Sequence, residues 1–129
     1  VKFNVVAFGG TVESFEDDFV RSDRRSKEKV SSWLKERDPR NYNKIRHSGT
    51  KAGEALIKAF EFNPEHIIFL SDGSPYGGMS VDEIIDMVEE YRTLYNPVVI
   101  NTMSYKSKKG RDFLEKLAEV SDGEFTKIE

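Results

Sequence analysis

The sequence predicts an α/β fold with a mostly parallel central sheet, one antiparallel edge strand and helices on both faces. Strand-like and helical segments alternate along most of the chain, which is the pattern of parallel strands joined by right-handed crossovers. Residues 3–8 and 67–70 are apolar at almost every position, as strands buried on both faces are. The length of 129 residues suits a single domain, residues 1–129, with one core.

The other predicted strands are less apolar. Residues 11–15 follow two glycines and return antiparallel to residues 3–8 as an edge strand. Residues 98–103 are a second buried candidate, next to residues 67–70, which we expect to be central. Residues 124–128 alternate polar and apolar side chains, which indicates a half-exposed edge strand.

Four segments have apolar residues at helical spacing: residues 22–37, 51–60, 80–95 and 108–120. The third has the clearest start, because Ser80 and Glu83 form the pattern of a capping box. Gly123 follows the fourth helix at the place of a left-handed C-terminal cap. Residues 16–48 are otherwise the least regular part of the chain, and we expect a long excursion over the surface.

Composition excludes several classes of protein. Hydrophobic residues make up 37% and charged residues 33%, which suits a soluble globular chain. The formal net charge of −3 offers no excess of positive charge for nucleic acid. The absence of cysteine removes disulfides and thiolate sites. No apolar run reaches the roughly 18 residues of a membrane span, and nothing in the sequence determines the compartment.

Asp72 is the sharpest candidate for a functional side chain. Ligands of open α/β sheets bind beyond the carboxyl ends of the strands, and Asp72 directly follows the most apolar strand. A carboxylate in that place tends to find a metal ion or backbone amides. The alternative is that Asp72 merely caps the following turn, in which Gly73 allows a tight change of direction.

Thr50 is the second candidate ligand. Its hydroxyl would hold a hard cation such as Mg²⁺ or Mn²⁺ together with Asp72. The alternative is that Ser48 and Thr50 are ordinary N-caps of the helix that follows. Contacts with a partner are expected from the residues around these two ligands: Ser48, Gly73, Ser74 and Tyr76.

Four segments together resemble von Willebrand factor A-like domains, the bacterial members most. Residues 3–9 resemble the second strand of that family, and residues 48–50 its glycine-threonine turn. Residues 67–75 are similar to its central strand and Asp-Gly turn, and residues 112–125 to its closing helix and strand. The ordered set covers nearly the whole chain.

The resemblance implies a Rossmann-like fold with a metal-ion-dependent adhesion site. In such a site a magnesium ion is held by hydroxyls and a carboxylate, and one coordination position is left for an acidic group on the partner. By this resemblance Thr50 and Asp72 match the second and third parts of the site.

The chain departs from the family at the first part of the site. The Asp-x-Ser-x-Ser motif, with the strand before it, would precede Val1, so we expect a fragment of a longer domain or protein. That strand normally lies between the strands at residues 3–8 and 67–70. These two strands would then pair directly, or another chain would fill the gap.

The sequence therefore predicts a protein-binding module for adhesion or complex assembly, not an enzyme, with Mg²⁺ or Mn²⁺ at a degenerate site and a protein partner that offers an acidic side chain. One alternative is a structural interaction domain without metal. Another is a magnesium-dependent phosphoryl-transfer or receiver-type domain with Asp72 as phosphoacceptor. Lys106 would serve as its lysine, but residues 8–10 offer no further carboxylate.

Overall fold

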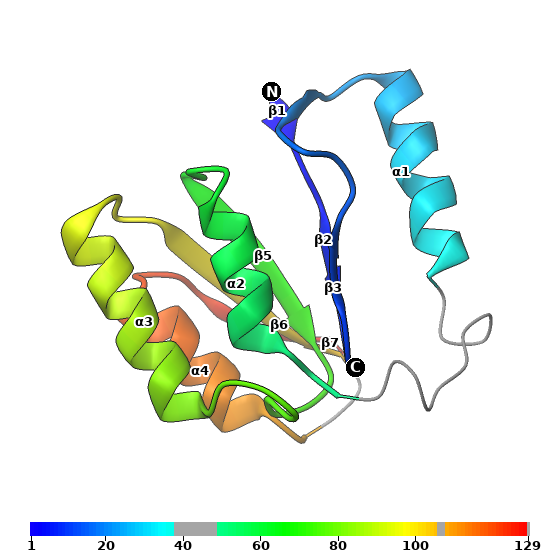
Figure 1. Cartoon of the computed structure of the whole chain (residues 1–129). Helices are drawn as coiled ribbons and strands as arrows, with labels where there is room; N and C mark the ends of the chain where they lie inside the picture. The colour runs from blue at the N-terminus through cyan, green and yellow to red at the C-terminus, as the bar shows by residue number, and fades with distance from the viewer. Residues whose placement is uncertain (38–48, 106–107, 129) are drawn as a thin grey trace.

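The structure is a computed structural model that describes residues 1–37, 49–105 and 108–128 (Figure 1). Its elements, in chain order, are β1 (Lys2–Phe3), β2 (Val6–Phe8), β3 (Val12–Ser14), β4 (Val20–Arg21), α1 (Arg24–Glu36), α2 (Ala52–Phe60), β5 (His66–Ser71), α3 (Val81–Leu94), β6 (Val99–Tyr105), α4 (Arg111–Val120) and β7 (Phe125–Ile128).

The last three strands form a parallel sheet in the order β5-β6-β7, with α3 and α4 as the crossovers. The strands predicted at residues 67–70, 98–103 and 124–128 are confirmed, and β7 lies at an edge as expected. The prediction that residues 67–70 are central is wrong within the described sheet, because β5 is the other edge strand.

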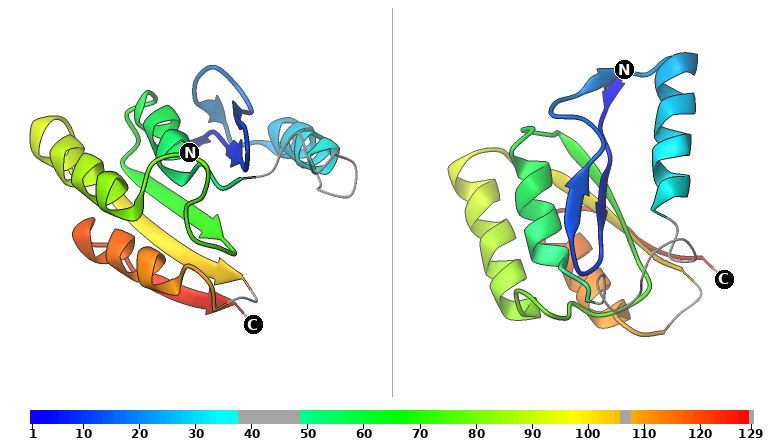
Figure 2. Two further views of the ribbon diagram at one scale, coloured as in Figure 1. Left: turned by 60° about the horizontal axis from the view of Figure 1, so that its bottom comes forward. Right: turned by 45° about the vertical axis from the view of Figure 1, so that its right-hand side comes forward.

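Helices α2, α3 and α4 cover one face of this sheet. Phe69 and Ile100 point into a core that includes Leu56 of α2, Ile84 of α3 and Leu114 of α4. The strands follow one another in a single direction, so right-handed crossovers place α3 and α4 on the same side. Figure 2 shows this arrangement, with α1 apart, beyond β2 and β3. Helices on both faces are therefore not confirmed for the sheet of β5, β6 and β7, whereas α1 and α2 lie on opposite sides of the β2–β3 pair.

The predicted strand at residues 3–8 is divided in two at Asn4. The Asn4 side chain accepts hydrogen bonds from the backbone N–H of Val5 and of Glu16, and it donates to the Glu16 carbonyl. Before this break β1 pairs with β4, and after it β2 pairs with β3, both antiparallel. The antiparallel turn to β3 is confirmed. Residues 3–8 are half-buried, however, rather than buried on both faces.

The region predicted to be irregular contains β4 and α1. Asp23 caps α1 by accepting a hydrogen bond from the Ser26 backbone N–H. The helix buries no residue fully; it rests on β3 through the Trp33 ring, whose centroid is 5.7 Å from that of Phe15. The helix predicted at residues 22–37 is confirmed over residues 24–36, but α1 lies outside the main core.

Among the helices of the described residues, none has both the length and the apolar character that a membrane span needs.

The start of α3 is the capping box that the sequence predicts. Ser80 accepts from the Glu83 backbone N–H at 3.2 Å, and the Glu83 carboxylate accepts from the Ser80 backbone N–H at 3.0 Å. Because that N–H bond favours the charged carboxylate, the pKa of Glu83 is lowered from its ordinary value.

The end of α4 differs from the prediction. Asp122, not Gly123, has the left-handed conformation, with φ of 59°. The Gly123 N–H donates to Ala118 O at 2.8 Å and the Asp122 N–H to Glu119 O at 3.4 Å, which is the pattern of a Schellman motif. Gly123 is needed for a different reason, because a Cβ there would collide with the carbonyl of Ile100.

We predict effects of different size on stability for two substitutions at this turn. Gly123→Ala forces the turn away from β6 and should lower the free energy of unfolding by about 1–3 kcal/mol. Asp122→Gly removes the strain of a left-handed non-glycine residue and should cost little or nothing. Urea denaturation of both variants measures this, and an equal loss in both would contradict it.

We also predict a contribution of Glu83 to the pH dependence of stability. A carboxyl whose folded pKa is lowered stabilises the fold above its ordinary pKa of 4.5, and this stabilisation is lost as the pH falls through the folded value. The variant Glu83→Gln should therefore lose less stability than the parent chain on acidification from neutral pH. Asp86→Asn, an exposed position on the same helix, is the control. Identical acid profiles for parent and Glu83→Gln would be contrary to this assignment.

Candidate functional site

The predicted site lies where β2 and β5 end. Strand β5 alternates its side chains, so Ser71 points into the protein and is 8% exposed, while Asp72, the next residue, is exposed. The Ser71 hydroxyl donates to Gly73 O at 3.1 Å and accepts from the Gly73 N–H at 3.3 Å. Ser71 therefore holds the turn that Asp72 was considered to cap.

The Asp72 carboxylate remains available for a ligand. No hydrogen bond or ion pair joins it to another residue in the described ranges. The remaining residues of its loop are also accessible, since Gly73 is half-buried, Ser74 is exposed and Tyr76 is 69% exposed. The loop thus presents a carboxylate, a hydroxyl and a phenol ring at one edge of the sheet.

Thr50 is held against this loop by its backbone. Its N–H donates to Tyr76 O at 2.7 Å, and its carbonyl accepts from the Tyr76 N–H at 3.0 Å. Lys51, the next residue, donates to Gly9 O at the end of β2. The Thr50–Lys51 segment therefore joins the end of β2 to the loop after β5.

The alternative of Thr50 as an N-cap is not observed. The N-cap of α2 is Lys51, and no side chain caps this helix. Among the predicted site residues, the structure brings Thr50 and Tyr76 into contact and places Asp72, Gly73 and Ser74 in the same loop. Ser48 lies outside the described residues.

Three residues that the sequence analysis did not single out support this arrangement. Glu54 accepts from the Met79 backbone N–H at 3.5 Å, and its carboxylate fills the space where a Cβ on Gly78 would lie. Gly110, with φ of 79°, lets the start of α4 approach Gly73 so closely that a Cβ would collide with the Gly73 carbonyl. In the sequence, the only sign of these contacts was that Gly78 and Gly110 lie in loops. The groups that the two glycines approach are visible only in the folded structure.

The donor set for a metal ion is small. The described residues contain no group of three or more His, Cys, Asp or Glu side chains that could hold an ion. The two predicted ligands at this edge supply one carboxylate, from Asp72, and one hydroxyl, from Thr50. Such a pair fits a divalent cation only where water or a partner supplies most of the coordination.

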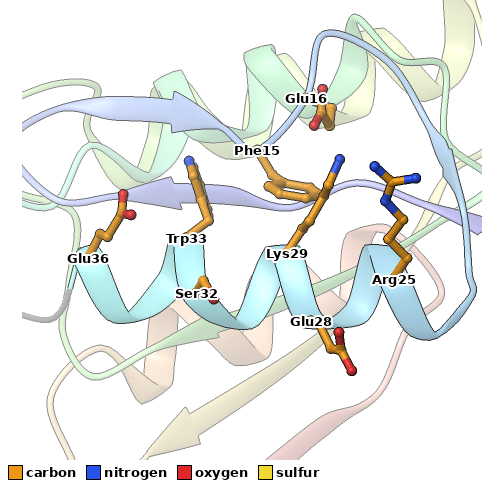
Figure 3. Close-up of a pocket in the computed structure, with 8 residues that line it drawn as sticks. All are labelled: Phe15, Glu16, Arg25, Glu28, Lys29, Ser32, Trp33 and Glu36. Atoms are coloured by element: carbon orange, nitrogen blue, oxygen red, sulfur yellow. The ribbon is translucent and has the colours of Figure 1, made fainter.

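A separate groove lies between α1 and the end of β3 (Figure 3). It has a volume of about 440 Å³ and is lined by Phe15, Glu16, Arg25, Glu28, Lys29, Ser32, Trp33 and Glu36. The groove combines an aromatic floor with charges of both signs, and it shares no residue with the loops around Asp72. It therefore gives no support to the predicted site.

Comparison with known proteins identifies one family. A family model described as von Willebrand factor type A domain matches residues 1–126 of the chain. No curated protein matches the sequence. The match includes Thr50, Asp72 and the loop between Gly73 and Tyr76.

We predict that Gly110→Ala disturbs the site without touching Asp72. The added Cβ meets the Gly73 carbonyl and imposes a left-handed conformation on alanine, at a cost of about 1–3 kcal/mol in unfolding free energy. The amide NMR signals of Gly73 and Ser74 should shift in the variant. Gly77→Ala also places alanine at positive φ, but its Cβ meets only Gly49 at 3.8 Å. Gly77→Ala should therefore leave the Gly73 signal in place, and a shift as large as that of Gly110→Ala would contradict the role of Gly110.

Proposed function

The chain belongs to the von Willebrand factor type A domain family, and from this premise we propose that it binds a partner protein through the loops at the carboxyl ends of β2 and β5. The family match over residues 1–126 is the observation that carries the proposal. The proposed activity is binding for adhesion or complex assembly, without catalysis.

The accessible side chains of this edge support the choice of surface. Tyr76 is 69% exposed and Leu70 is 50% exposed, so both offer apolar area to a partner. Aromatic side chains are enriched among the residues that dominate protein–protein binding. The Asp72 carboxylate and the Ser74 hydroxyl add polar groups beside them, which gives the mixture of apolar and polar contacts typical of an interface.

A divalent cation is the second part of the proposal. We infer that Asp72 and Thr50 hold Mg²⁺ or Mn²⁺ together with an acidic side chain of the partner, which supplies the oxygen ligands that the chain lacks. The Lys51 ammonium follows Thr50 in the sequence, and its positive charge weakens the binding of a nearby cation by repulsion. The isolated chain is therefore expected to bind the ion weakly.

We predict that Asp72→Ala abolishes divalent-ion binding while the fold is kept. The residue is exposed and follows the strand, so its removal leaves no cavity in the core. Calorimetric titration with magnesium and manganese should show an affinity loss of at least about tenfold, or about 1.4 kcal/mol. Asp86→Ala, which removes an exposed carboxylate from α3, is the matched control and should bind like the parent.

The same titration separates the alternatives. Equal ion affinity in the parent and in folded Asp72→Ala would remove the proposed metal site. If the parent binds no ion even with an added acidic peptide, partner binding without metal is the remaining function of this surface. Incorporation of phosphate into Asp72 from acetyl phosphate would instead identify a receiver-type domain and overturn the binding proposal.

A further inference from the structure

Helices α2 and α3 pack directly against each other. They lie side by side over the sheet (Figure 1), and the ring of Phe60 on α2 stacks on that of Tyr91 on α3, with 4.0 Å between the centroids. Near the start of both helices, a Cβ on Gly53 of α2 would collide with Ile84 of α3. Contacts at both ends therefore determine which sides of the two helices meet.

Apolar side chains remain accessible along the line where these helices meet. Ile57 is 44% exposed, and it lies one turn before Phe60, so it faces α3 as Phe60 does. Leu94 is 63% exposed and lies one turn after Tyr91. Tyr95 is 76% exposed, and its ring centroid is 5.6 Å from that of Tyr91. We call Ile57, Tyr91, Leu94 and Tyr95 the α2–α3 seam.

The seam is not part of the hydrophobic core. The inner sides of the two helices supply the core residues, among them Leu56, Ile84 and Val88. Apolar side chains that are exposed singly are common, whereas a contiguous group of them marks a surface on which another protein can bury area. The seam also shares no residue with the loops around Asp72. It is therefore a candidate docking surface of its own.

The exposed side of α3 carries a strong negative charge beside the seam. Its carboxylates belong to Asp82, Glu83, Asp86, Glu89 and Glu90. Its one base, Arg92, is turned inward: the side chain is 18% exposed, and it donates to the carbonyls of Val98 and Val120. Among the described residues, no ion pair joins the five carboxylates to a base.

The neighbouring side of α2 does not offset this charge. Its Lys58 ammonium pairs with the Glu61 carboxylate at 3.1 Å, so the two charges largely neutralise each other. Interfaces place opposite charges across from one another, and like charges that face each other oppose binding. A partner that covers the seam is therefore expected to be positively charged.

A helix fits this surface better than an extended strand. The backbone groups of α2 and α3 are bonded along each helix, so the seam offers no ladder to a strand. An amphipathic helix instead binds through apolar side chains spaced by one turn. Helix α1 of a second copy is basic, but its Trp33 ring already packs on Phe15, so its apolar side is occupied. These contacts favour a helix of another protein.

We propose that a basic amphipathic helix of a partner protein binds along the α2–α3 seam. Its apolar side chains cover Ile57, Leu94 and the rings of Tyr91 and Tyr95, and its lysine or arginine side chains face the carboxylates of α3. Glu90 is central to the charge contact, because it lies one turn before Leu94. This surface is additional to the one proposed at Asp72.

The probe is a labelled synthetic helical peptide of the same length as α3, with leucine along one side and lysine along the other. The control peptide has glutamate in place of every lysine. Fluorescence anisotropy should show that the lysine peptide binds the chain at least about tenfold more tightly than the glutamate peptide. Added salt should weaken this binding, because it screens exposed charges. Equal affinity for the two peptides, or no binding of the lysine peptide, would overturn the proposal.

Amide chemical shifts locate the bound peptide on the chain. The lysine peptide should move the NMR signals of Ile57, Tyr91 and Leu94 and leave that of Ser74 in place. Movement of Ser74 without the other three would put the peptide on the loop after β5 and would be contrary to the proposal. Movement of the three seam signals with chain concentration, in the absence of peptide, would show that a second copy covers the seam, and it would also overturn the proposal.

Two matched pairs of variants test the charge and the apolar contact. Glu90→Lys should weaken binding of the lysine peptide at least about tenfold. Glu119→Lys makes the same change of charge at an exposed position of α4 and should bind like the parent. Leu94→Ala should also weaken binding, whereas Leu34→Ala, which alters an exposed leucine of α1, should not. Equal effects within either pair would sink the proposed surface. Asp72→Ala should bind the peptide like the parent, so failure of the proposed metal site and failure of this proposal give different results.

Discussion

The packing of Phe69 connects the parts of this structure. Its side chain is 4% exposed, and its ring contacts Phe8 from the N-terminal strand pair and Phe113 from α4, with centroid distances of 5.2 and 6.2 Å. Because β2 and β5 share no described backbone ladder, this aromatic contact and the packing of both strands under α2 hold the N-terminal strand pair to the main sheet. The site depends on the same contact, since it needs the ends of β2 and β5 together.

The alternation of side chains along β5 then determines what the site presents. Phe69 and Ser71 point into the protein, so Leu70 and Asp72 are accessible. Ser71 is close enough to hold the Gly73 turn with its hydroxyl, which leaves the Asp72 carboxylate without a structural task among the described residues. A shift of one residue in this strand would exchange the buried and exposed sets. The accessibility of Asp72 is thus a consequence of how the core is packed.

The sequence predicts local features of this fold well and non-local features poorly. The capping box at Ser80 and the strand at residues 67–70 depend on neighbouring residues, and both are confirmed. The pairing of β1 with β4 depends on chain segments that meet only after folding, and residues 20–21 carry no periodic pattern to reveal it. The left-handed residue at the end of α4 was assigned to Gly123 because glycine favours that conformation, whereas the close approach to Ile100 is what requires glycine there.

The same distinction applies to the candidate site. The apolar run before Asp72 was sufficient to predict that this carboxylate stands at the end of a strand. The backbone pairing of Thr50 with Tyr76 was not predictable, because it joins segments on opposite sides of α2 and β5 in the sequence.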